Sequence, residues 1–358
     1  MDKKVLIGMS GGVDSAVAAA LLKHQGYEVT GVTLKLWDGN SDSGCCSLSD
    51  TEDARTVAQR LDIPFYVLNF KDMFRETVVD PFVRSYLKGE TPNPCLACNE
   101  SIKFSGMLAK AKAIGMDFIA TGHYARLRQD PATGRRMLLK AADSRKDQSY
   151  VLYSLSQEQL AATLFPLGGM EKPDVRKLAQ ELGFSVSNKP DSQDICFVGE
   201  GHYAEFIREY AGVEPAPGDF IDSEGRILGR HRGLIHYTVG QRKHLGASFG
   251  KRMVIIAKSA RENTITVGEE QEAQGMKAWV RETNWIRWEI PPKEFRAKVR
   301  TRYHGQEAEA TVETFPDGKV HVLFDKPQRA MAPGQAAVFY EGDIVLGGGI
   351  LEEGQHGI

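Results

Sequence analysis

Three of the five cysteines in this 358-residue chain stand in segments whose neighbours suit reactive thiols. Cys95 and Cys98 form a C-x-x-C pair behind Pro92 and Pro94, and the two prolines stiffen the backbone so that the thiols project from a defined loop. Cys196 is a single thiol far along the chain. A C-x-x-C pair is typical of a redox pair, half a zinc site or a set of cluster ligands. Because a second pair is absent, the sequence argues against structural zinc.

The cysteines also have explanations that involve no chemistry. Cys45 and Cys46 are adjacent in a segment ahead of an expected helix, where loop packing accounts for them. Cys196 lies between Ile195 and Phe197, so burial as a small hydrophobic residue stays open as an alternative to catalysis. An odd number of cysteines in a chain that opens without a signal-peptide pattern argues against a disulfide framework.

A glycine-rich turn at residues 8–15 (GMSGGVDS) is the second chemical feature. Glycines let the backbone turn tightly against an anion, and the amides and positive end of a following helix then hold phosphate. The turn lacks the Lys-Ser/Thr ending of a Walker loop and is not G-x-G-x-x-G. Asp14 offers a carboxylate that suits Mg²⁺ on a pyrophosphate. An ordinary tight turn is the plain alternative.

These groups require a rigid scaffold, and the hydrophobic pattern predicts one. Four apolar runs have the length of buried parallel strands, at residues 3–8, 28–36, 65–70 and 117–121. Helical patterns alternate with them at residues 14–25, from Ser49 (a capping box with Glu52) and at 101–114. The alternation predicts an α/β fold with a doubly wound parallel sheet. Sites in such sheets lie beyond the carboxyl ends of the strands.

The pattern changes after about residue 200. From Gly218 onward, short alternating runs are separated by Gly, Pro and Asp-Gly turns, and helical periodicity is nearly absent. We therefore expect three domains: a nucleotide-binding catalytic domain at 1–217, a small β-rich linking domain at 218–275, and a C-terminal β-barrel at 276–358. We expect Trp279, Trp285 and Trp288 in the barrel core.

Composition narrows the classes of function. The net charge is −2, so any contact with nucleic acid must come from local basic patches. Residues 226–252 contain seven Lys or Arg and no Asp or Glu, which predicts such a patch for tRNA, although a solvated face is the alternative. No run of about 18 apolar residues occurs, which argues against a membrane span and favours a cytoplasmic protein.

Several motifs occur in an order that matches one known family. They are SGGVDS at 10–15, TPNPCLACN at 91–99 with IKF at 102–104, ATGHY at 120–124, KDQSY at 146–150, DSQDICF at 191–197, GQRK at 240–243 and APGQ at 332–335. The first string resembles the pyrophosphate loop of ATP pyrophosphatases. The whole set resembles the bacterial tRNA-specific 2-thiouridylases, from residue 3 to near residue 350. That resemblance implies an ATP-dependent enzyme that converts the wobble uridine of certain tRNAs to 2-thiouridine.

Residue by residue, the resemblance implies a role for each matching position. ATP would bind to Gly8, Met9, Ser10, Gly11, Gly12, Val13, Asp14, Ser15, Leu34 and Gly122. The target base or the rest of the tRNA would contact Asn93, Pro94, Cys95, His123, Lys146, Asp147, Gln148, Arg302, Tyr303 and Gln335. Cys196 would carry a persulfide and Cys98 would be the second catalytic thiol. A sulfur-donor protein, a cysteine desulfurase or a relay carrier, is the implied partner besides tRNA.

Cys95 departs from the family, since many members have Asp there. Three thiols, Cys95, Cys98 and Cys196, then belong to one expected site. Three thiolates can hold a [4Fe–4S] cluster with one iron open to sulfide. A cluster route therefore stands beside the persulfide–disulfide route, which we favour.

Two other functions compete. A different ATP-pyrophosphatase ligase, such as an amidotransferase or an argininosuccinate-type enzyme, would need no thiols, and the thiol loop and basic segment argue against it. A non-enzymatic RNA-binding protein would not need an intact phosphate turn. A sulfur-transfer assay on unmodified tRNA distinguishes all three.

Overall fold

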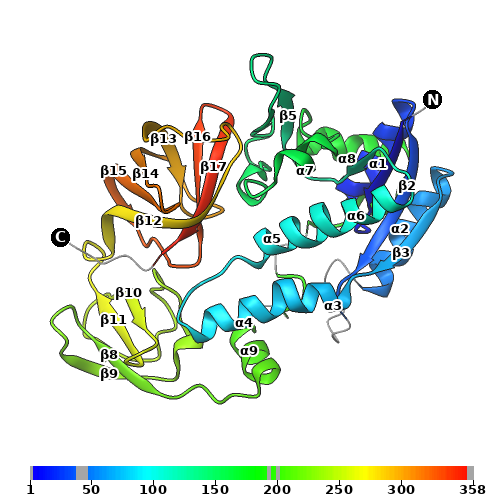
Figure 1. Ribbon diagram of the computed structural model, residues 1–358. Coiled ribbons are helices and arrows are strands. Elements are labelled where there is room, and N and C mark those ends of the chain that lie inside the picture. Colours follow the sequence, from blue (N-terminus) through cyan, green and yellow to red (C-terminus); the bar gives the residue numbers. More distant parts are fainter. Residues whose placement is uncertain (1–2, 38–46, 192–194, 199–201, 353–358) are drawn as a thin grey trace. The chain divides into compact units, whose positions relative to one another are not determined.

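The structure is a computed structural model that describes residues 3–37, 47–191, 195–198 and 202–352 (Figure 1). The chain forms two compact units that do not follow chain order. The first contains residues 1–78, 94–201 and 343–345, and the second contains residues 79–93, 202–342 and 346–358. Cys45 and Cys46 lie outside the described residues, as does the 192–194 part of the DSQDICF motif. The three-domain division remains a prediction.

A five-stranded parallel sheet is the framework of the first unit, with strand order β3-β2-β1-β4-β7. The strands are β1 (Lys4–Gly8), β2 (Glu28–Lys35), β3 (Phe65–Asn69), β4 (Phe118–Ala120) and β7 (Thr163–Leu164). The predicted parallel sheet is confirmed. The chain order reverses at β1, which has β2 on one side and β4 on the other. Such a switch point leaves room for a ligand at the carboxyl ends of the strands.

Helices surround the sheet. They are α1 (Val13–His24), α2 (Leu48–Arg60), α3 (Lys71–Phe74), α5 (Pro94–Ala97), α6 (Met107–Ala113), α7 (Gln157–Ala161) and α8 (Lys172–Glu181), with π-helices at Arg75–Val79 and Cys98–Gly106 and short 3₁₀ turns at Ser149–Val151 and Ser185–Asn188. A β-hairpin, β5 (Arg126–Gln129) and β6 (Arg136–Leu139), completes the unit. Val5 and Ile7 pack into one apolar cluster with the alanine-rich α1 and with α8. Leu6 points to the opposite face because side chains alternate along a strand.

The end of α1 and the start of α2 can be compared with the predicted helix ends. Gly26 follows α1 with a φ of +85°, as expected of a glycine that ends a helix. α2 begins two residues earlier than predicted, since Ser47 rather than Ser49 is the N-cap and its hydroxyl accepts the Asp50 N–H at 3.0 Å.

The second unit is β-rich, as predicted. It contains α4 (Asp80–Leu87), α9 (Tyr203–Ala211), a 3₁₀ turn at Leu234–His236 and a four-stranded sheet made of β8 (Gly218–Ile221), β9 (Ile227–His231), β10 (Val254–Ser259) and β11 (Thr264–Gly268). Phe220, Ile255 and Ile265 lie in the core of this small sheet domain.

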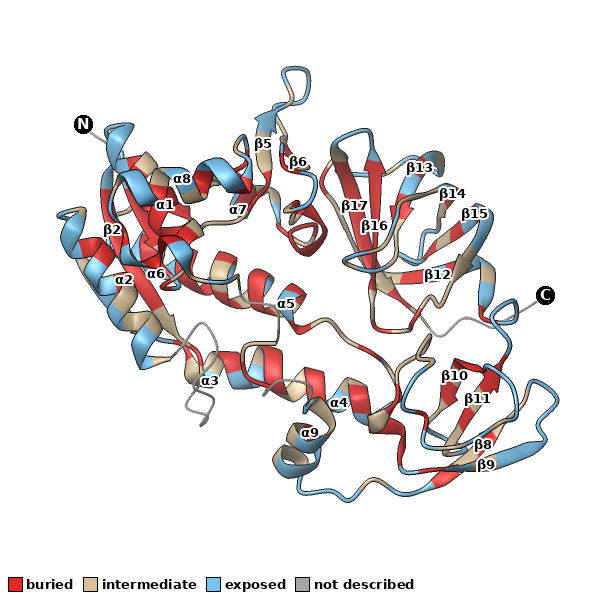
Figure 2. Cartoon of the chain, turned by 180° about the vertical axis from the view of Figure 1, so that it is seen from behind, coloured by how far each residue is buried: buried red, intermediate tan, exposed pale blue. Residues whose placement is uncertain are grey.

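A six-stranded barrel follows, in the order β12-β15-β14-β13-β16-β17, and it closes through β12 and β17. Its strands are β12 (Gln274–Trp285), β13 (Glu294–Arg300), β14 (Ala308–Thr314), β15 (Val320–Arg329), β16 (Ala336–Glu341) and β17 (Ile344–Leu351). Figure 2 shows the buried residues that run along β16 and β17. The predicted C-terminal barrel is therefore confirmed.

The barrel also corrects one expectation. Trp279 is 38% exposed and contacts Phe315 and His321, so placing it in the core was wrong. Trp285 is half-buried and stacks on Phe339 with ring centroids 5.5 Å apart. Among the described residues, no helix is long and apolar enough to cross a membrane.

Candidate active site

The glycine-rich turn joins β1 to α1, where the sequence predicted a phosphate site. Gly12 is the N-cap of α1 and brings no side-chain cap to the first turn. The first amides of a helix have no partner within it, so this uncapped end suits an anion. The Ser15 hydroxyl accepts the Ser10 N–H at 3.1 Å and donates to the Gly12 carbonyl at 3.2 Å, and the Thr33 hydroxyl donates to the Met9 carbonyl at 2.7 Å. These bonds fix the shape of the turn from both sides.

At two positions in the site, neighbouring backbone atoms lie so close that only glycine fits. Gly11 has a φ of +72°, and a Cβ there would lie 2.2 Å from the Asp50 carbonyl oxygen. Gly122, just after β4, approaches the start of α1 so closely that a Cβ would lie 2.8 Å from the Ser15 nitrogen. The β4 end and the phosphate turn therefore form one continuous surface, as the predicted ATP contacts require.

Both oxygens of the Asp14 carboxylate accept hydrogen bonds. The Lys172 ammonium donates to Asp14 Oδ1 at 2.6 Å and to Oδ2 at 2.7 Å, and the Tyr124 hydroxyl donates to Oδ1 at 2.7 Å. Burial and the negative charge of Asp14 raise the pKa of Tyr124. The predicted Mg²⁺ ligand is thus occupied by a cation from α8. In this arrangement Asp14 does not fit a direct magnesium ligand, and no step below depends on one.

Lys172 also reaches the segment that leads to Cys196. Its ammonium lies 2.8 Å from Asp191 Oδ1, and Asp191 accepts from Lys146 at 2.7 Å and Arg176 at 3.0 Å as well. Burial raises the pKa of Asp191, but the hydrogen bonds from Lys146 and Lys172 outweigh it and hold that pKa below its usual value. The carboxylate is therefore ionised and acts as an anchor for three cations.

The predicted thiols occupy three kinds of local structure. Cys95 is exposed in α5, Cys98 is buried at the first residue of the Cys98–Gly106 π-helix, and Cys196 is half-buried in a turn. π-helical turns occur often at functional sites. The residue after Cys196, Phe197, packs edge-on against Phe74 with ring centroids 5.5 Å apart. This contact fixes the end of the thiol segment against α3.

A cluster requires the three thiols to converge. Among the described residues, no group of three or more His, Cys, Asp or Glu side chains is arranged to hold a metal ion. Cys95, Cys98 and Cys196 therefore do not fit a [4Fe–4S] cluster in this arrangement, and we derive no step through one.

His123 follows β4 and lies among aromatic rings. Its Nδ1 is 2.8 Å from the Thr121 hydroxyl, and its ring centroid is 5.8 Å from that of Phe104 and 6.3 Å from that of Phe165. Burial lowers the pKa of His123 well below its usual value, and the positive charge of Lys103 lowers it further. A neutral imidazole is therefore held at the edge of the sheet where the target base was expected.

The predicted KDQ contact segment is tied into its own unit. Lys146 pairs with Asp191, and Gln148 accepts the Tyr124 N–H at 2.9 Å. Asp147 is buried, and its carboxylate accepts from Ala141 N–H, Ser149 N–H and the Ser149 hydroxyl at 2.9–3.2 Å. The observed role of these side chains is to shape a loop, and a contact with tRNA remains a prediction for them.

The remaining predicted tRNA contacts belong to the second unit. Arg302 is exposed and Tyr303 is half-buried in the loop between β13 and β14. Gln335 donates to the Thr91 carbonyl at 2.6 Å, two residues before Asn93. Gln335 thus supports the segment that leads to Asn93 within this unit.

Acidic side chains from outside the basic run at 226–252 lie beside several of its cations. Arg226 pairs with Asp222, Arg230 with Asp219, Arg242 with Glu270 and Lys251 with Glu269, so acids outside that stretch neutralise four of the seven cations. The remaining three, Arg232, Lys243 and Arg252, are exposed and have no ion pair among the described residues. The predicted local basic patch is therefore reduced to these three charges without an ion pair among the described residues.

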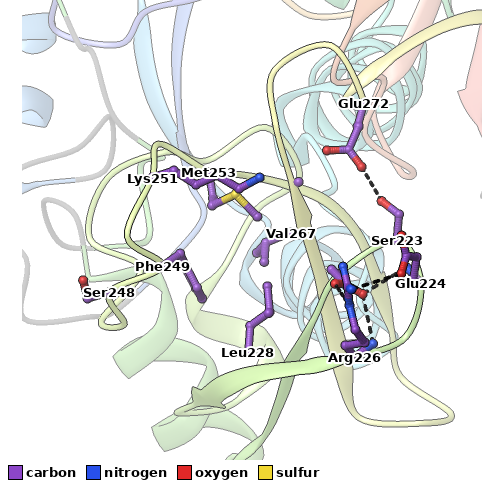
Figure 3. A pocket seen from close by; sticks show the side chains of 12 residues that line it. Ser223, Glu224, Arg226, Leu228, Ser248, Phe249, Lys251, Met253, Val267 and Glu272 are labelled. Carbon is purple, nitrogen blue, oxygen red and sulfur yellow. Dashed lines mark hydrogen bonds and ion pairs between the residues drawn. The ribbon is translucent and has the colours of Figure 1, made fainter.

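A pocket in this domain is also lined by both acids and bases. Figure 3 shows apolar Leu228, Phe249 and Val267 in its wall, with Arg226 bonded to acids and Glu272 bonded to Ser223 at its rim. The lining holds three acids, Asp222, Glu224 and Glu272, against two cations, Arg226 and Lys251, so we assign it no anion.

Lys172 is a site residue that sequence reasoning missed, as is Lys189, whose ammonium donates to the Gly11 carbonyl at 3.1 Å. One signal was available for Lys172, because a lysine at the first residue of a helix is opposed by the helix dipole unless acids offset it. Nothing in the sequence indicated that the acids would be Asp14 and Asp191.

A parallel α/β sheet with an uncapped, glycine-rich turn at its switch point defines a class: nucleotide-binding domains that hold phosphate on the first helix. Family models match the chain in three segments, described as a tRNA methyl transferase HUP domain at residues 3–200, a tRNA methyl transferase PRC-barrel domain at 204–269 and an aminomethyltransferase beta-barrel domain at 276–351.

Similar full-length proteins narrow that class. The chain is 50% identical to the tRNA-specific 2-thiouridylase MnmA of Acetivibrio thermocellus, over 98% of this chain and 99% of that protein. It is 48% identical to the protein of that name from Clostridioides difficile, over 99% of each. A solved NMN synthetase from Francisella tularensis is 17% identical, with a TM-score of 0.35 over 60% of this chain and 79% of that one. The chain belongs to the family of tRNA-specific 2-thiouridylases.

Proposed function

We propose that this protein is a tRNA-uridine 2-sulfurtransferase that uses ATP to place sulfur at C2 of the wobble uridine. Family membership supports the activity in tRNA uridine thiolation, and the uncapped phosphate turn at the switch point of the sheet is the observation that carries the ATP-dependent step. The substrate is tRNA, so we expect the protein to act in the cytoplasm.

The first step activates a poor leaving group. The C2 oxygen of uracil attacks the α-phosphorus of ATP, pyrophosphate leaves, and AMP becomes attached to that oxygen. The turn from Gly8 to Ser15 would hold the phosphates through its amides, and Leu34 and Gly122 would lie beside the adenosine. The base must be flipped out of the anticodon stack to reach this site, and Asn93, Pro94 and Cys95 would contact it there. His123, which is neutral, would offer a hydrogen bond without adding charge.

The second step delivers sulfur. A persulfide on Cys196, charged by a sulfur-donor protein, attacks C2 through its outer sulfur, and AMP leaves with the original oxygen. The Cys98 thiolate then attacks the Cys196 sulfur, which breaks the S–S bond, releases 2-thiouridine and leaves a Cys98–Cys196 disulfide. An external thiol reduces that disulfide. The buried position of Cys98 at a π-helix start supports a dedicated role for this thiol.

Separate loss of the two steps tests this proposal. Unmodified tRNA, ATP and a cysteine desulfurase with L-cysteine are supplied, and both AMP and 2-thiouridine are measured. We expect Gly11→Ala to lose both products, because the added Cβ collides with the Asp50 carbonyl. Cys196→Ser should still release AMP but form no 2-thiouridine. Cys98→Ala, without added reductant, should accumulate an enzyme–tRNA adduct that dithiothreitol cleaves.

Two outcomes would overturn the proposal. If Cys196→Ser and Cys98→Ala both keep the wild-type yield of 2-thiouridine, the thiols are not catalytic and the ligase alternative gains support. If anaerobically prepared protein contains iron and loses its activity when iron is removed, the cluster route replaces the persulfide route. Activity in iron-free protein supports the persulfide route.

A further inference from the structure

One buried ammonium bonds to both the phosphate turn and the segment that leads to Cys196. The Lys172 Nζ lies 2.6 and 2.7 Å from the two oxygens of Asp14 and 2.8 Å from Asp191 Oδ1. An ammonium has three protons to donate, so these contacts account for all of them. Asp14 belongs to the first turn of α1, and Asp191 precedes Cys196 by five residues.

Both its burial and its position oppose a charge on Lys172. The side chain is only 8% exposed, and burying an ammonium is costly unless carboxylates offset it. It is also the first residue of α8, where the helix dipole repels a cation. The two carboxylates therefore decide where the ammonium lies, and the ammonium in turn holds the two carboxylates together.

The Asp191 carboxylate bonds to two further cations besides Lys172. Asp191 also accepts from Lys146, at the start of the predicted tRNA-contacting segment, and from Arg176 on α8. The backbone that leads to Cys196 thus begins from a point fixed by three cations. At its other end, the ring of Phe197 packs against Phe74.

We propose that Lys172 is a positioning residue for sulfur transfer: its ammonium keeps the Cys196 segment aligned with the phosphate turn, so that sulfur reaches the base where AMP has been attached. This inference rests on the proposed function. Without that alignment, the adenylated base survives long enough for water to attack C2, which releases AMP and restores uridine. Loss of the Lys172 contacts should therefore release AMP without forming 2-thiouridine, in addition to any decrease in the overall rate.

The number of 2-thiouridines formed per tRNA-dependent AMP released measures that alignment. We expect Lys172→Met and Asp191→Asn to lower this ratio about 10- to 100-fold, the size of effect that small misplacement of reacting groups produces. Lys172→Arg, which keeps the charge, should recover part of it. The matched control is Lys177→Met, because Lys177 is on the same helix but its side chain is 75% exposed, and its one ion pair among the described residues is with Glu181 at 3.9 Å.

The results separate three cases. A purely structural role would lower the melting temperature and the amount of active enzyme but leave the ratio at the wild-type value, and that result would overturn the inference. If Lys172→Met fails to fold, Asp191→Asn and Lys172→Arg decide the question by the same ratio. If the wild-type protein forms AMP with tRNA but never 2-thiouridine, the proposed function itself fails.

Discussion

Lys258, in the second unit, is a lysine that folding removes almost entirely from water. The residue is 6% exposed, its ammonium donates to the Tyr237 carbonyl at 2.8 Å, and that ammonium lies 5.9 Å from the centre of the Tyr86 ring. Burial lowers the pKa of Lys258 to about 8. The unfolded chain therefore holds this proton more tightly than the folded protein does.

We predict that Lys258→Met stabilises the protein at pH 7. The lysine costs stability below pH 8, and this cost disappears as the pH rises from about 8 towards the unfolded pKa of about 10.4. The gain at pH 7 should reach about 1–3 kcal/mol once the lost hydrogen bond is counted. Denaturant unfolding at pH 7 and pH 10 checks this, and a variant advantage that is equal at both pH values would contradict it.

A second prediction at this scale concerns the imidazole of His123. Because burial lowers its pKa well below the usual value, we expect no titration of this ring near pH 6.5. The buried Thr121 hydroxyl requires an acceptor and His123 Nδ1 is within 2.8 Å, so the proton should be on Nε2. Long-range ¹H–¹⁵N NMR measures both properties. Thr121→Val should shift the tautomer towards Nδ1–H, and a ring that titrates at pH 6.5 would contradict the prediction.

At the scale of elements, the contact between the β4 end and α1 depends on the absence of one side chain. We predict that Gly122→Ala weakens ATP binding about 10- to 100-fold, because overpacking costs about 1–3 kcal/mol where a Cβ would lie 2.8 Å from the Ser15 nitrogen. Gly169→Ala is the matched control, since its Cβ would meet nothing within 4 Å. Calorimetric titration with ATP compares the two variants, and equal affinities would refute the close-contact argument.

The elements show where sequence reasoning succeeds and where it stops. Apolar runs and the Gly-rich turn predicted β1 to β4 and α1, because each depends on local pattern. The two-residue β7 is too short to leave a pattern. The helix predicted at 101–114 begins within a nine-residue π-helix that runs from Cys98 to Gly106. Spacing of apolar residues does not distinguish π from α turns over so short a length.

Ion pairs between residues that are distant in the sequence could not be predicted either. The Lys172 bridge joins residues 158 positions apart in the sequence, and no local window contains both ends. The ion pairs of the basic run at 226–252 were missed for the same reason at shorter range, because the acids that form them lie outside it, at Asp219, Asp222, Glu269 and Glu270. The barrel was predicted from turns, but not that Trp279 would face outward.

For the whole molecule, ion pairs neutralise most of the basic run at 226–252, so we expect tRNA binding through the second unit to depend on few cations. We predict that Lys243→Ala reduces the slope of log affinity against log salt by about 0.7–0.9, the value for one phosphate contact. Arg226→Ala should change the slope little, because Asp222 and Glu224 already neutralise that guanidinium. Filter binding of unmodified tRNA across a salt series measures both. Equal slopes for Lys243→Ala and the wild-type protein would reject the assignment.

The interleaving of the two units has a consequence for how the polypeptide is made. The first unit includes Asp343, whose carboxylate accepts from Arg126 at 2.8 Å and whose carbonyl accepts the Lys140 N–H at 2.8 Å. A ribosome must therefore synthesise the linking strands and most of the barrel before the nucleotide-binding half gains its last native hydrogen bonds. Until then the β5–β6 hairpin lacks these partners, so a nascent chain stalled before Asp343 should be cleaved by protease near that hairpin.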